Sequence, residues 1–258
     1  MGPERFIHRL KIGVIDEAMR RTADNVLYVD ADTFFVRDVS SVASSVTEKQ
    51  CVMHLHEHQL ESLRSFSQGG TVEAMYEFVN GGSVRLADGT TLTLSRTLSS
   101  WNAGVIGLHQ SHARLLPDVY AVCDQLFENT RNRVSEQYAF SIILQRALTI
   151  QSADSTVYHY YDPVKKTIVD EFIEKHLNSS WLDRSLEDRL GLVRDWTQLL
   201  PDHIARHPLI LEDTALRCLA EKRRIAALAW AFRVIRRRKG VGHVFARRFV
   251  AELRRTLQ

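Results

Sequence analysis

The sequence predicts an α/β domain followed by an all-helical, basic C-terminal appendage. Apolar side chains recur at helical spacing over residues 6–19, and the run Val26–Val29 that follows is apolar and rich in residues that favour strands. Further strand-like and helical segments alternate along the next hundred or so residues, whereas the pattern from Lys166 onward is almost entirely helical. We therefore expect two domains, the first over 1–166 and the second over 167–258.

The segments of the first domain are predicted in order from their periodicity and turn residues. The pattern indicates a buried parallel strand over 26–29, a strand over 51–56 leading into a helix over 57–66, a hairpin over 81–94 that turns at Asp88 and Gly89, a strand over 104–108, and helices over 112–127 and 136–146. No internal repeat and no low-complexity linker interrupts them.

Length and composition exclude several classes of protein. The chain has 258 residues, 45% of them hydrophobic and 25% charged, which suits a full core and excludes collagenous, low-complexity and wholly disordered chains. No apolar run approaches the roughly 20 residues of a membrane span, and no apolar leader follows Met1. The cysteines Cys51, Cys123 and Cys218 lie far apart, which argues against a disulfide framework and a structural zinc site. We expect a cytoplasmic protein, either soluble or peripheral on the inner face of the membrane.

Two carboxylates follow the first predicted strand. Asp30 and Asp32 are two residues apart, so in an extended segment their side chains share one face and could hold a divalent cation that also binds phosphate oxygens. Ligands commonly bind beyond the carboxyl ends of strands in α/β sheets. An Asp-x-Asp pair by itself is more often a solvated turn or a helix cap than a metal site, so other segments have to complete a site.

Three later segments offer groups that such a site would need. The first holds the amide of Asn102 and the glycine Gly104 before a strand, and the second holds the carboxylate of Glu136 and the amide of Gln137 at the start of a helix. The third holds the imidazole of His159, six residues before the ammonium of Lys165. A neutral imidazole can bind a metal, and an ammonium can pair with phosphate. Each segment alone also has a purely structural explanation, such as backbone hydrogen bonding by Asn102 or burial of His159 in the core.

Taken in order, these segments resemble the motifs of nucleotide-sugar glycosyltransferases of the A-type (GT-A) fold, and they look most like glycosyltransferase family eight. The resemblance covers roughly Lys11 to Lys165. It implies a mixed sheet flanked by helices. It also implies transfer of a sugar from a nucleoside diphosphate sugar to an acceptor hydroxyl on a glycan or lipid-linked acceptor, in the synthesis of cell-surface glycans.

The resemblance further implies a cofactor and its ligands. Mn²⁺, or Mg²⁺, would lie on the donor diphosphate and would be held by Asp30, Asp32 and His159, with Asp30 also counted among the donor-binding residues. Lys165 matches the family's phosphate-binding lysine. These assignments make the first domain a metal-dependent hexosyltransferase.

The remaining roles implied by the resemblance concern the donor sugar. Asn102 and Gly104 match residues that contact it. Gln137 and Glu136 match a pair beside the reacting carbon and are the expected catalytic residues.

The front of the chain differs from this pattern. A nucleotide-binding βαβ unit takes about 30 or more residues, and residues 1–25 cannot contain one before the Asp-x-Asp strand. We therefore expect the first domain to lack its N-terminal base-binding segment. This leaves a second interpretation open, a non-catalytic remnant or scaffold protein that retains the fold without donor binding.

Charge is distributed unevenly along the chain. The segment from Lys222 to Arg255 holds twelve Lys and Arg against the single acid Glu252, a formal +11; the whole chain carries +3, which leaves −8 for the rest. Aromatic and aliphatic residues recur among the basic ones at helical intervals, which indicates a pair of amphipathic basic helices. Such helices either pack on the body with a solvated basic face or lie on an anionic membrane surface, and we expect no nucleic-acid partner.

Overall fold

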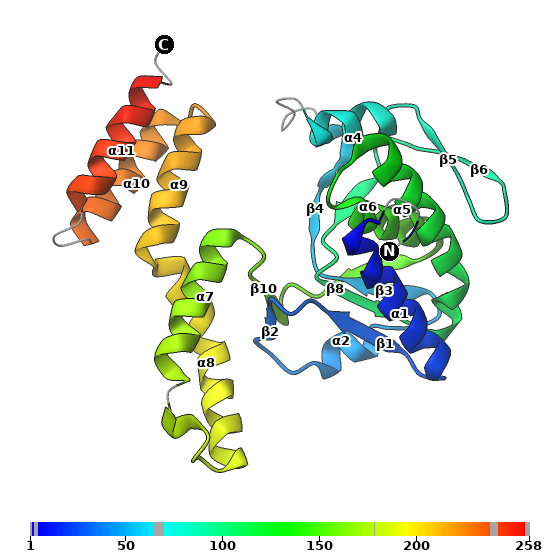
Figure 1. Cartoon of the computed structure of the whole chain (residues 1–258), viewed down its shortest axis with the longest axis horizontal. Helices are drawn as coiled ribbons and strands as arrows, with labels where there is room; N and C mark the ends of the chain where they lie inside the picture. Colours follow the sequence, from blue (N-terminus) through cyan, green and yellow to red (C-terminus); the bar gives the residue numbers. More distant parts are fainter. Residues whose placement is uncertain (1, 3–4, 64–69, 178, 238–241, 256–258) are drawn as a thin grey trace. The chain divides into compact units, whose positions relative to one another are not determined.

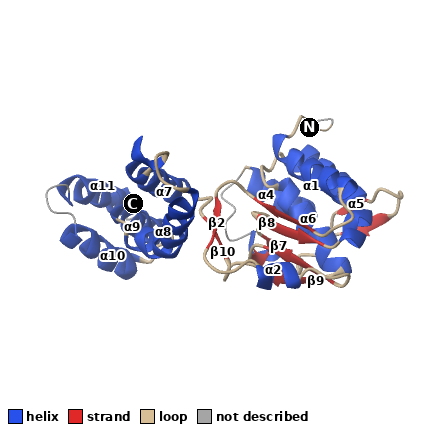
Figure 2. Cartoon of the chain, turned by 90° about the horizontal axis from the view of Figure 1, so that it is seen from below, coloured by secondary structure: helices blue, strands red, loops and turns tan. Residues whose placement is uncertain are grey.

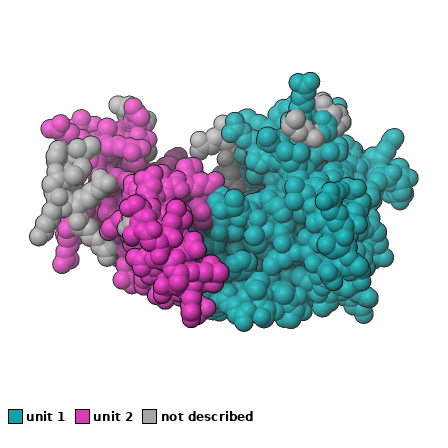
Figure 3. Space-filling view, turned by 60° about the horizontal axis from the view of Figure 1, so that its bottom comes forward, with its two compact units in different colours: residues 1–159 teal, residues 160–258 magenta. Residues whose placement is uncertain are grey.

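The chain folds into two compact units, Met1–His159 and Tyr160–Gln258 (Figure 3). This computed structural model describes all residues except 1, 3–4, 64–69, 178, 238–241 and 256–258 (Figure 1). The first unit is mixed α/β and the second is helical. The division after His159 lies a few residues before the expected boundary at 166, so that Lys165 belongs to the second unit.

A four-stranded sheet forms the centre of the first unit. Its order is β1 (Val26–Val29), β8 (Val105–Leu108), β3 (Gln50–Met53) and β9 (Thr149–Ser152). Strand β8 pairs antiparallel with both β1 and β3, and β3 pairs parallel with β9. The prediction of a buried parallel strand over 26–29 was therefore wrong in direction and in burial, because β1 is half-buried and antiparallel. An apolar run indicates a strand but does not determine the direction of its partner.

Helices cover this sheet on both sides (Figure 2). The helical segments of the first unit are η1 (Ile7–Arg9), α1 (Leu10–Arg21), α2 (Ser40–Ser44), η2 (Leu60–Ser62), α4 (Thr71–Val79), η3 (Gln110–Leu115), α5 (Leu116–Thr130) and α6 (Ser135–Ala147). The predicted helices over 6–19, 112–127 and 136–146 are confirmed, with shifted ends. In the main core, Ile12 and Ile15 of α1 and Phe140 of α6 join the same buried cluster as Ile106 of β8. Val105 of β8 belongs to a smaller cluster that also contains Val42 of α2, so β8 is buried on both faces.

Three two-stranded sheets complete the unit. They are β2 (Thr33–Phe35) with β10 (Val157–His159), β4 (His56–Gln59) with β7 (Ser99–Trp101), and β5 (Ser83–Arg85) with β6 (Thr91–Thr93). The pair β5 and β6 confirms the predicted hairpin, in which Gly89 has φ 86°. A positive φ of this kind costs glycine little, which explains the residue at the turn.

The predicted helix over 57–66 is wrong for 57–59, which form a strand, whereas 60–63 are helical. Residues 56–59 form β4, whose backbone pairs with β7, and Leu60–Ser62 form one short helical turn. The sequence His-Glu-His-Gln has no apolar stripe to bury as a helix, so pairing with a distant strand determines its conformation. Residues 64–66 of the prediction lie outside the described residues.

The second unit consists of helices. They are α7 (Pro163–His176), η4 (Ser179–Trp181), α8 (Leu186–Arg206), α9 (Pro208–Ala220), α10 (Arg224–Arg237) and α11 (Gly242–Arg255). The side chain of Asp162 caps α7 by accepting the N–H of Val164 at 2.8 Å, directly before Pro163 at the first helical position. Helices α9, α10 and α11 share an apolar cluster that includes Leu211 and Val234. None of the described helices has both the length and the apolar character needed to cross a membrane.

Candidate metal site

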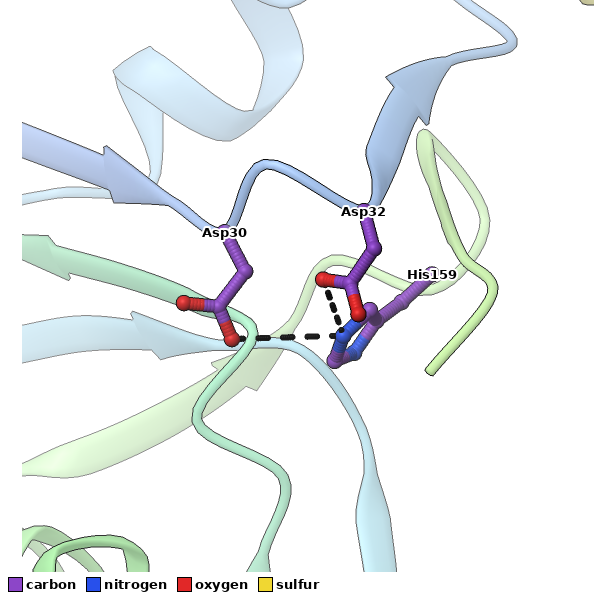
Figure 4. Close-up of side chains that lie close together, drawn as sticks. All are labelled: Asp30, Asp32 and His159. Atoms are coloured by element: carbon purple, nitrogen blue, oxygen red, sulfur yellow. Dashed lines mark hydrogen bonds and ion pairs between the residues drawn. The ribbon is translucent and has the colours of Figure 1, made fainter. Parts of the chain in front are cut away.

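Three residues that the sequence singled out meet at the carboxyl end of β1. Asp30 and Asp32 lie in the turn between β1 and β2, and His159 is the last residue of β10 (Figure 4). The antiparallel pairing of β2 with β10 places His159 opposite Thr33, which brings the imidazole to the two carboxylates. His159 Nε2 lies 3.1 Å from Asp32 Oδ1 and 3.9 Å from Asp30 Oδ2, and one ligand atom from each residue falls within 4.8 Å of the others.

The hydrogen bonds of Asn102 determine which nitrogen of His159 carries its proton. Asn102 Oδ1 accepts the N–H of Gly104 at 3.0 Å, and Asn102 Nδ2 donates to Glu57 Oε1 at 3.1 Å. Asn102 Oδ1 is therefore an acceptor, and at 2.9 Å it takes the proton of His159 Nδ1. In the neutral ring, Nε2 then carries a lone pair that faces the carboxylates.

The surroundings of His159 favour that neutral ring. Burial lowers the pKa of His159 more than the nearby Asp32 raises it, and His54, whose ring centre lies 5.2 Å away, lowers it further. A lone pair on nitrogen thus faces two carboxylates, an arrangement that a cation between them stabilises. Two carboxylates and one imidazole could hold a divalent cation and would leave about half of an octahedron for other oxygen ligands.

Gly104 is required by the close approach of His159. A Cβ at this position would overlap Nδ1 and Cε1 of the imidazole and would lie 2.9 Å from its Cγ. The carbonyl of Gly104 also accepts the N–H of Asp30 at 2.8 Å, so this glycine joins the end of β1 to the start of β8. Gly104 therefore shapes the metal site through its backbone.

Lys11 of α1 supplies a cation that no spacing in the sequence singles out. Its Nζ donates to Asp30 Oδ2 at 3.0 Å and to the carbonyl of Ala103 at 3.1 Å, and it lies 3.8 Å from Glu136 Oε1. The hydroxyl of Tyr28 donates to the other oxygen of Asp30 at 2.7 Å. The only sequence signal for Lys11 is its position beside the buried residue Ile12 on an amphipathic helix.

Glu136 lies in the first turn of α6 and is almost completely buried. Its Oε2 has no hydrogen-bond partner among the residues that the structure describes. Burial raises the pKa of Glu136 to about 7, although the ammonium of Lys11 opposes the shift. Glu136 therefore exchanges its proton near neutral pH at a position connected to Asp30 through Lys11.

Gln137, which is buried, and Glu57, which is half-buried, form a hydrogen-bond network behind the metal site. Gln137 Oε1 accepts the N–H of Ala103 at 3.1 Å, and its Nε2 donates to Glu57 Oε2 at 2.8 Å. Glu57 also accepts from Ser100 Oγ at 3.1 Å and, as described above, from Asn102. Both ends of the Gln137 amide are thus engaged in holding the segment 100–103. No sequence pattern indicated that Glu57 would accept these hydrogen bonds, because the segment 57–66 was predicted to be a helix.

Lys165 lies in the first turn of α7 in the second unit. Its Nζ lies 6.0 Å from the centre of the Tyr161 ring. The phosphate-binding role of Lys165 stays a prediction.

Comparison with protein-family models, with curated proteins and with solved structures found no match for this chain. The argument for function therefore rests on the chemistry of the site. Among the described residues, Asp30, Asp32 and His159 are the one group of three or more acidic, histidine or cysteine side chains close enough to share a metal ion.

Proposed function

We propose that the chain is a metal-dependent glycosyltransferase of the GT-A type, which moves a sugar from a nucleoside diphosphate sugar to an acceptor hydroxyl of a glycan or lipid-linked acceptor. One observation carries the proposal. His159 lies more than a hundred residues after Asp30 and Asp32, yet the ligand atoms of the three residues lie within 4.8 Å of one another. A cation bound by two carboxylates and one imidazole keeps coordination positions for diphosphate oxygens.

The chain's own residues would prepare this site before the donor binds. Asn102 holds the Nδ1 proton of His159, so that Nε2 is available as a ligand. Mn²⁺ or Mg²⁺ bound by Asp30, Asp32 and His159 would neutralise the charge that develops on the diphosphate leaving group. Glu136 offers a buried carboxyl oxygen near Asp30, and Gln137 positions the backbone of Ala103.

Calorimetric titration of the full chain with Mn²⁺, with and without a nucleoside diphosphate, tests the proposal. We expect weak binding of Mn²⁺ alone and at least tenfold tighter binding when the diphosphate supplies the missing ligands. Asp32→Asn should abolish Mn²⁺ binding with and without the diphosphate. Asp24→Asn, which changes an exposed carboxylate just before β1, should leave both Mn²⁺ affinities unchanged. Equal Mn²⁺ affinity in the two titrations would contradict the shared site.

A non-catalytic scaffold is the second candidate, and Lys11 is the observation that favours it. Its ammonium lies 3.0 Å from Asp30 Oδ2 and already provides Asp30 with a positive partner. In a scaffold this contact would take over the stabilising role of the metal. The same titration separates the candidates, because a scaffold of this kind would bind Mn²⁺ neither alone nor with a nucleoside diphosphate.

A further inference from the structure

Helix α10 of the second unit has two apolar faces. One face packs against neighbouring helices through Ala227, Ala231 and Val234, which are buried. The other face, here called the outer stripe, is exposed and consists of Ile225 (87% exposed), Leu228 (53%), Phe232 (67%) and Ile235 (48%). The four residues recur at intervals of three and four, so they form one continuous line along the helix.

This outer stripe differs from the scattered apolar residues found on most protein surfaces. Isolated exposed side chains need no explanation, but four large ones in a row indicate an interaction surface. Arginines border the stripe on both sides. At about 100° per residue, Arg224 and Arg236 lie roughly 60° to either side of its centre. The exposed face of α10 is therefore apolar along its middle and positively charged at its edges.

A cavity of about 560 Å³ adjoins the same helix within the second unit. Its lining residues are Ala205, Arg206, Leu211, Trp230, Arg233 and Arg236. The guanidinium of Arg233 lies 4.6 Å from the centre of the Trp230 ring, and Arg206 pairs with Asp202 at 2.9 Å. At about 100° per residue, Arg233 and Trp230 lie about 120° and 180° from the centre of the stripe, whereas Arg236 lines the cavity and also borders the stripe.

We propose that α10 docks on an anionic membrane surface. The outer stripe would enter the boundary between headgroups and acyl chains, and the bordering arginines, Arg224 and Arg236, would contact lipid phosphates. The charge of the region agrees, since 222–255 carries twelve basic residues and one acid. This proposal is independent of glycosyl transfer, because every residue that carries it lies in the second unit, whereas the candidate metal site lies in the first.

Charge also decides between a membrane and a second copy of the chain. Two copies joined through their outer stripes would bring the arginine borders of both copies together, and like charges facing each other across an interface disfavour association. An anionic bilayer instead offers apolar chains for the stripe and negative headgroups for its borders. An anionic membrane is therefore complementary both to the outer stripe of α10 and to the arginines at its borders.

Co-sedimentation of the full chain with vesicles tests the proposal. Vesicles of phosphatidylcholine with 30% phosphatidylglycerol should bind the chain at least tenfold more tightly than phosphatidylcholine alone, and binding should weaken when salt is raised from 0.15 M to 0.5 M. The double variant Leu228→Ser, Phe232→Ser should bind anionic vesicles at least tenfold more weakly. Leu186→Ser, Leu190→Ser provides a matched control, because these leucines are also exposed (65% and 57%) and four residues apart, but on α8.

Circular dichroism and thermal unfolding establish that each variant is folded. Equal binding of the chain to neutral and anionic vesicles would overturn the proposal, and so would anionic binding that the α10 variant leaves unchanged. Light scattering without vesicles gives a further decisive result. A stable dimer that dissociates on Leu228→Ser, Phe232→Ser would assign the outer stripe to a second copy of the chain.

Discussion

Gly104→Ala should disrupt the metal site through one added methyl group. The new Cβ would lie 2.9 Å from Cγ of His159 and would overlap two further ring atoms. Carbon atoms make their best contacts at about 3.5–4.0 Å, so the ring has to shift by more than half an ångström. The ring cannot do so freely, because Nδ1 bonds Asn102 at 2.9 Å and Nε2 lies 3.1 Å from Asp32.

These contacts set the size of the effect. Loss of the hydrogen bond from His159 Nδ1 to Asn102 costs about 1 kcal/mol, and overpacking of a buried site adds about 1–3 kcal/mol. We therefore expect Gly104→Ala to lower the free energy of unfolding by about 3 kcal/mol. Because the Nε2 of His159 leaves its place beside the aspartates, Mn²⁺ affinity should fall by at least tenfold, even in protein that remains folded.

Chemical denaturation and calorimetry with Mn²⁺ measure the two effects separately. Gly13→Ala is the matched control in the same unit, because its Cβ would meet only Tyr120 Oη at an ordinary distance of 3.6 Å. Within α1 this change should stabilise the protein by about 0.5–1 kcal/mol and leave Mn²⁺ affinity unchanged. If Gly104→Ala preserved both stability and Mn²⁺ affinity, the close packing of Gly104 on His159 could not be part of the site.

Two further predictions concern the carboxyl groups of Glu57 and Glu136. Glu57→Ala should lower the free energy of unfolding, measured by chemical denaturation, by about 3 kcal/mol, because it removes the acceptor of Ser100, Asn102 and Gln137. The control Glu61→Ala changes an exposed neighbour and should have little effect. Equal losses of stability in the two variants would contradict the network. Burial raises the pKa of Glu136 to about 7 from an ordinary 4.5, so between these pH values the folded protein keeps a proton that the unfolded chain releases. The free energy of unfolding therefore falls as pH rises from 4.5 to about 7. Glu136→Gln should remove that part of the pH dependence of unfolding, and an unchanged profile would show that Glu136 is ionised throughout.

The sequence predicted the parts of the fold and site that depend on short segments. The helices α1, α5 and α6 and the strand β8 follow from periodicity, and the hairpin of β5 and β6 follows from Asp-Gly at its turn. Asp30, Asp32 and His159 could be grouped from the order of their motifs, although only the pairing of β2 with β10 brings His159 to the aspartates.

The parts that the sequence could not predict depend on partners far along the chain. The apolar residues of β1 would suit either direction of pairing, and its antiparallel partner β8 lies nearly eighty residues later. Lys11 and Glu57 resemble ordinary surface charges until the fold surrounds them with Asp30, Glu136, Asn102 and Gln137. A buried charge is identified by its partners, and spacing within one segment does not report them.

The balance of charge in the site links these buried groups to the proposed metal. Asp30, Asp32, Glu57 and Glu136 bring four carboxyl groups together around the segment 100–104 and the end of β1, whereas Lys11 is the cation that contacts two of them. Burying carboxylates is costly without compensating positive charge, and part of that cost is offset because Glu136 holds its proton up to about pH 7. The remaining negative charge lies at Asp30 and Asp32, where the Nε2 lone pair of His159 adds a third electron-rich atom. A divalent cation would compensate this charge, and this requirement is our reason for proposing a metal-dependent activity ahead of the scaffold.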